Sequence, residues 1–297
     1  MSKRIATAVA IVGAAGFISG CAFEQPSPGC QVQDSDHPWQ AVYTLKNPAD
    51  ASKSCGKLKG EVIGVWKFVK DPLTKPTNQF VIRPAGTAFR FAYTYEVQAK
   101  NTDGTPKVDK DGKPVMEEVT ADRADPEQIT GQTADGKPIT AKEAASSGAA
   151  SLADEPDANG LCLAEGFTRE ATVTASEVRH QETNEVLVPA ETATYKYKKV
   201  EIYSAARAPG TQLQGEFTYS DGTGCEADYT MLALWPQVEC DPAAFANPTE
   251  ENKASRCGEG SGLNPDFDAV CVAGIGLNGA AACVPNPATG LTLVGKK

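Results

Sequence analysis

The stretch "QLQGEFTYSDGTGCEADYTMLALW", from Gln212 to Trp235, holds the pattern that decides the fold. It consists of two strand-like runs on either side of Asp221-Gly222. An Asp-Gly pair between such runs is a strong local signal for a β-hairpin, because both residues tolerate the backbone of a tight turn. We therefore predict two antiparallel strands joined by a turn at Asp221-Gly222.

Further strand patterns precede this hairpin. The segments "TREATVTASEV" (168–178) and "ATYKYKKVEIYS" (193–204) alternate in polarity, as the two faces of a half-buried strand do. The segment "GEVIGVWKFVK" (60–70) is apolar on both faces, which indicates a buried strand. Residues 79–97, "QFVIR", "PAG" and "TAFRFAYTYEV", predict a second hairpin.

The strands are nearly all separated by short turns and lack the crossover helices that parallel strands require. We expect a mainly β protein, an antiparallel barrel or sandwich of about seven to eight strands. The predicted divisions are a signal peptide (1–20), a lipidated tether and connecting segment (21–55), a β domain (56–240) and a Cys-rich C-terminal appendage (241–297). Residues 98–160 lack aromatic side chains, so we interpret them as a polar insertion of exposed ribbon or disordered chain, with a short helix near 141–150.

The N-terminus has the features of an exported protein. A basic start at Lys3 and Arg4 precedes thirteen uncharged residues, Ile5 to Phe17. This pattern is typical of a signal peptide, and it is shorter than the roughly 20 apolar residues that span a bilayer. One interpretation is an ordinary secretory signal, with Cys21 available for a disulfide.

The next four residues, Ile18-Ser19-Gly20-Cys21, resemble the lipobox of bacterial lipoproteins, in which an aliphatic and two small residues precede a cysteine. The resemblance implies cleavage before Cys21 and attachment of acyl chains such as palmitate to it. Several chains on one cysteine hold a protein stably on a bilayer. Ala22 follows Cys21, where Asp would retain a lipoprotein of enteric bacteria in the inner membrane, so the resemblance favours the outer membrane.

The charge of the chain argues against nucleic acid as a partner. The net charge is −10, and loss of residues 1–20 with Lys3 and Arg4 but no acidic residue moves it to −12. Binding to nucleic acid depends on clustered Lys and Arg side chains that neutralise phosphates, and this chain has no basic run.

The remaining cysteines are even in number, which predicts disulfides in an exported chain. Eight cysteines allow 105 pairings. We expect neighbours along the chain to pair, because short loops close first. No CxxC pair is present, so no metal and no redox dithiol is predicted. The predicted bridges are Cys30–Cys55, Cys162–Cys225, Cys240–Cys257 and Cys271–Cys283.

The triplet Gly64-Val65-Trp66 resembles the GxW motif of lipocalins, whose Trp plugs the closed end of a ligand-holding barrel. The resemblance implies that Gly64 and Trp66 form the floor of a cup for a small apolar ligand. A Trp that is plain core is the simpler interpretation.

Two other features of the sequence give only weak evidence for a binding or catalytic site. Asp109 to Gly112, followed by Glu118, partly matches a calcium-binding EF-hand loop, but Lys107 stands where the first ligand belongs, so a solvated turn is favoured. The histidines, His37 and His180, belong to no catalytic motif. We predict neither enzymatic activity nor a cofactor.

The predicted function is therefore that of a lipid-anchored envelope lipoprotein, attached to the membrane through Cys21 and acting as a structural or interaction module with an envelope protein as partner. A lipocalin-like carrier of a small apolar ligand is one alternative. A carbohydrate-active enzyme, which needs only two carboxylates placed by the fold, is another.

Overall fold

The computed structural model describes residues 29–33 and 38–291. The predicted leader, the lipobox with Cys21, and His37 lie outside these residues. Within the described part of the chain, no helix has the length and apolar character needed to cross a membrane.

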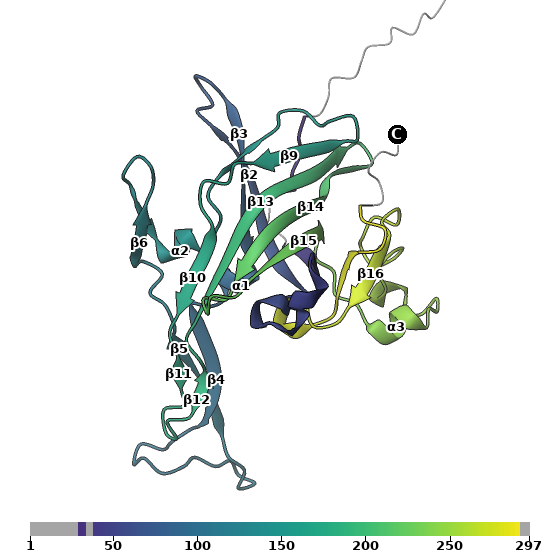
Figure 1. Ribbon diagram of the computed structural model, residues 1–297. Coiled ribbons are helices and arrows are strands. Elements are labelled where there is room, and N and C mark those ends of the chain that lie inside the picture. Colours follow the sequence, from purple (N-terminus) through teal and green to yellow (C-terminus); the bar gives the residue numbers. More distant parts are fainter. Residues whose placement is uncertain (1–28, 34–37, 292–297) are drawn as a thin grey trace, which may run out of the picture.

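The described residues contain an eight-stranded antiparallel barrel (Figure 1). Each strand pairs with its neighbour in the order β13, β14, β15, β1, β2, β3, β8 and β9, and β9 pairs with β13 to close the ring. The expected mainly β fold is confirmed, and closure makes it a barrel. The strands are β1 (Trp39–Leu45), β2 (Gly60–Lys70), β3 (Thr77–Pro84), β8 (Ala150–Leu152), β9 (Leu161–Glu165), β13 (Glu191–Ala205), β14 (Ala208–Ser220) and β15 (Glu226–Leu234).

Two different strands pair with the two halves of one edge of the long strand β13. Its C-terminal half pairs with β9, while its N-terminal half pairs with β10 (Ala171–Ala175). The alternation of "ATYKYKKVEIYS" places Tyr195 and Tyr197 inside the barrel and the neighbouring Lys196 and Lys198 in solvent. The predicted alternation matches the burial as far as Lys198. A register shift between Tyr197 and Lys199 then brings Val200 into the core, whereas strict alternation places it on the solvent face with Lys196 and Lys198.

The hairpin predicted around Asp221-Gly222 is formed by β14 and β15. Phe217 pairs with Tyr229 across it. The Asp221 Oδ1 atom accepts a hydrogen bond from the backbone N–H of Thr223 at 3.0 Å, and Gly222 has a φ of 77°. An Asp side chain that bonds its own backbone two residues on, followed by a residue free to adopt positive φ, is what makes this pair a turn signal.

The second predicted hairpin, over residues 79–97, is wrong. Its first arm is β3, but β3 pairs with β2, and the chain after Pro84 forms the short helix α1 (Ala85–Ala88). Its second arm, β4 (Ala92–Gln98), pairs instead with β5 (Met116–Asp122). The alternating pattern identified both strands correctly, but a pattern on one strand does not determine its partner.

Two barrel strands lie in segments that the composition had assigned elsewhere. The strand β1 lies in the predicted connecting segment 21–55 and is flanked by β15 and β2. The strand β8 lies in the predicted insertion 98–160 and pairs with β3 and β9. Surrounding Pro, Asp and Ser residues hid both strands, because composition averages over windows longer than either strand.

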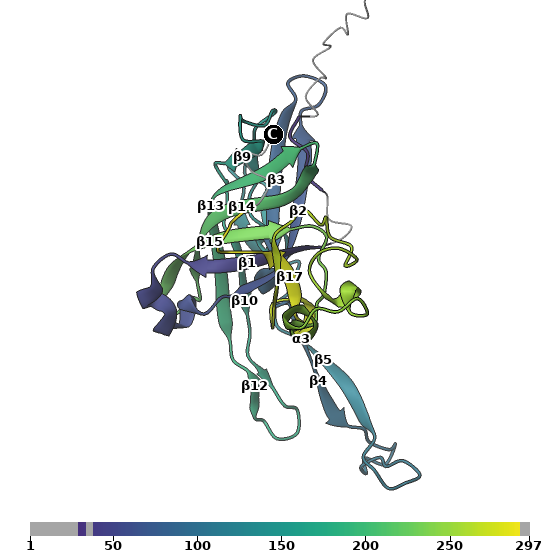
Figure 2. The same cartoon turned by 90° about the vertical axis from the view of Figure 1, so that its right-hand side faces the viewer.

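Much of the rest of the insertion forms exposed ribbons, although Arg123, Ala145 and Ser147 in it are buried. The short helix expected near 141–150 is present as α2 (Ala141–Ala144). Thr140 and Glu143 cap α2 reciprocally in a capping box. The ribbon of β4 and β5 and the neighbouring pair β11 and β12 extend from one end of the barrel (Figures 1 and 2). The smaller elements are β6 (Ile129–Gln132), β7 (Pro138–Thr140), β11 (Val178–Arg179), β12 (Val186–Val188), η1 (Pro48–Ser52) and η2 (Ser54–Gly56).

The predicted disulfide pairing is wrong at every bridge. Two bonds join segments more than a hundred residues apart, because the barrel brings the connecting segment against β9 and against the β14–β15 turn. Cys271 and Cys283 lie opposite each other on adjacent strands, yet Cys271 bonds to Cys240, just before the appendage, and Cys283 bonds to Cys257. Proximity in the fold, rather than loop length, thus decides the partners. The bonds are Cys30–Cys162, Cys55–Cys225, Cys240–Cys271 and Cys257–Cys283.

The C-terminal appendage packs on the outside of the barrel (Figure 1). Val42 and Leu234, which point outward from β1 and β15, are buried by Ile275, Val284 and Leu263 of the appendage. The buried Gln40 side chain donates a hydrogen bond from Nε2 to the backbone oxygen of Ile275 at 2.8 Å. The elements of the appendage are α3 (Pro242–Ala246), η3 (Lys253–Ser255), β16 (Ala269–Val272), η4 (Leu277–Gly279) and β17 (Ala282–Pro285).

Candidate functional site

Aromatic rings pack against one another inside the barrel. The ring of Phe217, which is fully buried, lies at the centre of this cluster. Its centroid is 4.8 Å from that of Tyr43, 5.4 Å from that of Tyr229, 5.6 Å from that of Tyr197 and 5.7 Å from that of Tyr195. These separations are those of directly packed rings. This level of the barrel is therefore a packed core.

The half-buried Glu61 places its carboxylate beside this cluster. It lies on β2, on the same inward face as Ile63 and Val65. It accepts hydrogen bonds from the Tyr43 hydroxyl at 2.9 Å, from the Tyr195 hydroxyl and from the backbone N–H of Gly86 in α1. Buried carboxylates are tolerated only when their oxygens are paired in this way.

Burial changes the pKa values of Glu61 and of the tyrosines beside it. Burial raises the pKa of the Glu61 carboxyl above its ordinary value, against the opposing effect of its hydrogen bonds. Burial, and after it the charge of Glu61, raises the pKa of Tyr43 and of Tyr195 well above the ordinary value. The cluster thus holds its protons more firmly than free side chains do.

The raised pKa of Glu61 predicts a pH-dependent contribution to stability. A proton on Glu61 favours the folded state, so this contribution is complete below the ordinary pKa of 4.5 and is lost as the pH rises through the raised value. The Glu61→Gln variant lacks this titration. The free energy of unfolding is measured with urea from about pH 4 to pH 8. The value for the variant minus the value for the wild type is expected to increase as the pH rises.

The matched control for this measurement is Glu127→Gln, which removes an exposed carboxylate from the turn before β6. It is expected to follow the wild-type dependence. A constant difference between Glu61→Gln and wild type across the whole range would contradict the assignment.

The helix α1 covers the barrel interior next to Glu61. Only glycine fits at position 86, because a Cβ there would collide with the Tyr195 hydroxyl. Arg90, just after α1, forms an ion pair with Glu191 at 3.1 Å, and Arg123 pairs with the same carboxylate at 2.9 Å. The Arg123 side chain is 5% exposed, so its pair holds buried charge that would be costly to leave alone. This end of the barrel is therefore fixed by a polar network.

The structure places the GxW triplet differently from a lipocalin cup floor. Ile63 and Val65 face the core, and the half-buried Trp66 side chain lies on the opposite, outer face. Its indole folds back over Gly64, at a distance that leaves no room for a Cβ. Gly64 is therefore required by Trp66 rather than by a ligand, and the interior is occupied by the rings around Phe217.

The remaining sequence-predicted residues lie on the ribbons. Asp109 Oδ1 accepts hydrogen bonds from the backbone N–H groups of Asp111 and Lys113, both at 2.9 Å, so its carboxylate stabilises its own exposed turn. His180 lies between β11 and β12, where its Nδ1 atom accepts from the backbone of Glu182 and Thr183 at 3.3 Å. Its ring is 5.7 Å from that of Tyr95 on the adjacent ribbon.

Three sulfur atoms, that of Cys240 just before the appendage and those of Cys257 and Cys271 within it, lie within 4.8 Å of one another. All three belong to disulfides. A zinc site needs thiolates, which a disulfide does not offer. In the oxidised protein this cluster is a pair of adjacent cross-links.

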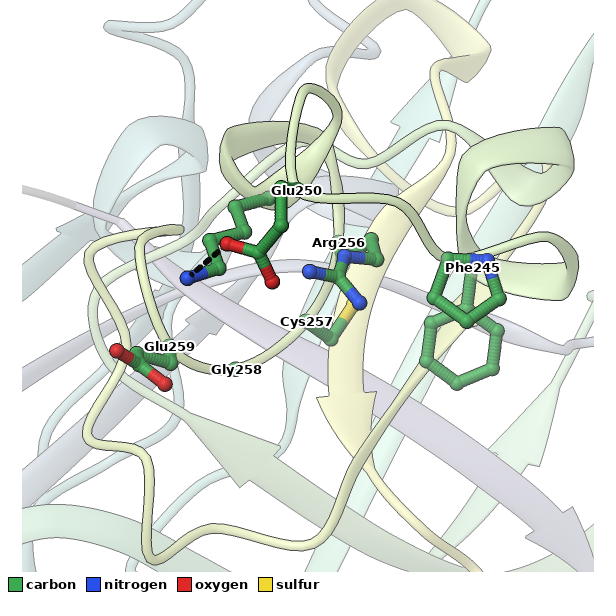
Figure 3. Close-up of a pocket in the computed structure, with 8 residues that line it drawn as sticks. Phe245, Glu250, Arg256, Cys257, Gly258 and Glu259 are labelled. Carbon is green, nitrogen blue, oxygen red and sulfur yellow. Dashed lines mark ion pairs between the residues drawn. The ribbon is translucent and has the colours of Figure 1, made fainter.

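A surface pocket of about 470 Å³ opens in the appendage beside Cys257 (Figure 3). The ring of Phe245 and the guanidinium of Arg256 border it, and Lys253 is paired with Glu250 at 2.6 Å on its rim. The Arg256 Nε atom is buried and has no hydrogen-bond partner among the described residues. A ring beside a guanidinium suits a protein or peptide side chain that is partly apolar and partly charged.

Sequence reasoning missed this pocket. Residues 250–259, "EENKASRCGE", look like any polar loop, because nothing in them shows that Phe245 and the Cys257–Cys283 bond border the same hollow. The nearest signal was the density of cysteines, which indicated a fixed shape for these loops.

Two comparisons with known proteins found similarity to this chain. Residues 37–236, which span the barrel from just before β1 to just after β15, match the family model MlpA. A Myxococcus xanthus protein named "Putative lipoprotein MlpA" is 33% identical over 291 residues, covering 96% of this chain and 97% of that protein. No solved structure shows significant similarity to the chain.

Proposed function

The chain belongs to the MlpA family, and from this premise we propose that it is a lipoprotein held on the bacterial outer membrane by acyl chains on Cys21, where it acts as a non-catalytic interaction module. Two features that agree with each other carry the proposal. A relative that matches nearly the whole chain is named as a lipoprotein, and Ile18-Ser19-Gly20-Cys21 has the lipobox pattern.

The distribution of contacts supports an interaction module over a carrier. A carrier of a small apolar ligand needs interior space, and the packed rings around Phe217 occupy that level of the barrel. The ribbons and the pocket at Arg256 lie outside the barrel core and are open to a partner. Binding residues are commonly carried on such peripheral loops, positioned by a rigid scaffold.

The enzyme alternative has less support. A glycosidase needs two carboxylates about 5 to 10 Å apart across a substrate. The two carboxylates at the covered end of the barrel are already engaged, Glu61 by hydroxyls and a backbone N–H and Glu191 by Arg90 and Arg123. Side chains held in this way fix a structure.

The anchor is tested by Cys21→Ala in the native host. We expect the wild-type protein to sediment with outer membranes and its intact mass to include acyl chains and exclude residues 1–20, because two or three chains hold a protein stably on a bilayer. Cys21→Ala is expected to leave the outer-membrane fraction and to lack the added mass. The control Ser19→Ala keeps a small residue in the lipobox and is expected to behave as wild type.

An unmodified Cys21 in the wild-type protein, or a Cys21 bonded to another sulfur, would refute the anchor. The same lipidated material tests the second half of the proposal. After purification in mild detergent, we expect cross-linking mass spectrometry to find a polypeptide in contact with the ribbons or with the Arg256 pocket. A small apolar molecule retained in native mass spectra would instead support the carrier.

A further inference from the structure

One end of the barrel fixes the chain that leads to Cys21. The backbone oxygen of Cys30 accepts a hydrogen bond from Lys67 Nζ at 2.6 Å, and the backbone oxygen of Gly29 accepts one from Ser204 Oγ at 3.0 Å. Cys30 is also bonded to Cys162 on β9. The described chain therefore starts at a fixed point on this end of the barrel.

The hairpin of β2 and β3 projects from the same end, opposite to the ribbon of β4 and β5 (Figures 1 and 2). We define the β2–β3 tip as residues 68–76. Leu73 at its turn is 95% exposed, and Phe68 and Val69 are 43% and 45% exposed. Two exposed lysines, Lys70 and Lys75, flank the turn. Three large apolar side chains held in water at one tip are unfavourable unless another surface covers them.

The length of the chain outside the structure limits where this end can lie. Eight residues lead from Cys21 to Gly29, and a fully extended chain of that length reaches about 28 Å. The strand from Lys67 to Lys70 carries the tip roughly 10 Å beyond the level of Cys30. A bilayer that holds acyl chains on Cys21 is thus within reach of the tip.

We infer that the β2–β3 tip inserts into the headgroup region of the membrane that holds Cys21, as a second, non-covalent contact beside the lipid anchor. The inference rests on the proposed function, because it requires acyl chains on Cys21. Leu73, Phe68 and Val69 lie at the boundary between headgroups and acyl chains, and the amines of Lys70 and Lys75 extend back to the lipid phosphates. Apolar burial drives the contact, so it does not need the basic surface that this acidic chain lacks.

The test uses the full lipidated protein carrying Leu73→Trp in vesicles of phosphatidylethanolamine and phosphatidylcholine with brominated acyl chains. Bromine quenches only nearby indoles, so the emission added over wild type reports whether position 73 lies in the bilayer. We expect a clear loss of the added emission, because a side chain at the boundary between headgroups and acyl chains lies near the bromine atoms. The control Val108→Trp, at a 53% exposed position beyond the β4–β5 ribbon, is expected to lose none.

The outcomes separate the inference from the anchor. Protein that fails to float with the vesicles would overturn both together. Protein that floats while position 73 stays unquenched would overturn the inference alone, as would equal quenching at positions 73 and 108. A change in emission that depends on protein concentration and not on bromine would show that a second copy of the chain covers the tip, which also overturns it.

Discussion

Phe217→Ala is expected to lower the free energy of unfolding by about 3–5 kcal/mol, the usual cost of removing a buried phenyl ring. Phe217 is fully buried and packs against four other rings, which come from β1, β13 and β15. These strands are held in a closed barrel and cannot collapse freely into the space, so the cavity term adds to the lost transfer free energy. Urea unfolding followed by far-UV circular dichroism measures the loss.

Phe217→Leu is the control, because it keeps most of the volume and is expected to cost much less. Phe267→Ala tests a ring of similar burial at the junction between barrel and appendage, where loops can adjust more easily. An unfolding midpoint of Phe217→Ala close to that of wild type would mean that the interior is loosely packed. That result would revive the carrier hypothesis, since a tolerant interior has room for a ligand.

The second large effect is expected for Cys55→Ala combined with Cys225→Ala. Their bond joins residues 170 apart in sequence, and restriction of the unfolded chain over such a loop gives about 5 kcal/mol. The fully buried Cys55 belongs to the barrel core and anchors η2 against the β14–β15 turn. We expect a lower urea midpoint and a lower melting temperature.

The pair Cys240→Ala and Cys271→Ala is the matched control, with a separation of 31 residues and about 4 kcal/mol from the same reasoning. The cost of this pair is expected to fall mainly on the appendage. Equal loss of barrel structure in both double variants would contradict the assignment of separate roles. Melting that does not respond to reducing agent would contradict the importance of all four bonds.

The strands of this fold were largely predictable, and their pairing was not. The hairpin at Asp221-Gly222 is local, because the turn residues themselves bring the two arms together. The second arm of the supposed hairpin at 79–97 instead finds β5, whose sequence "MEEVTAD" carries little strand signal of its own. Strand partners and disulfide partners are both properties of the closed barrel, and neither is encoded in a short window.

The polar cluster around Glu61 shows a second limit of prediction from the sequence. Glu61 stands next to an apolar run, where a charged residue looks like the solvated start of a strand. Its partners Tyr43, Gly86 and Tyr195 come from three separate segments, so only the folded chain reveals why the carboxylate is there. The one signal in the sequence is that Glu61 shares the alternation of Ile63 and Val65, which both point into the core.

The Cys30–Cys162 bond has a mechanical consequence for a chain tethered at Cys21. Tension between the envelope and a bound partner would pass through this covalent link into β9 and its neighbour β13. The load would then fall on the β9–β13 pair, between Lys199–Tyr203 and Leu161–Glu165, where the backbone hydrogen bonds of the pair share the force. Without the bond, the same pull would reach β1 first and could peel that strand away one hydrogen bond at a time.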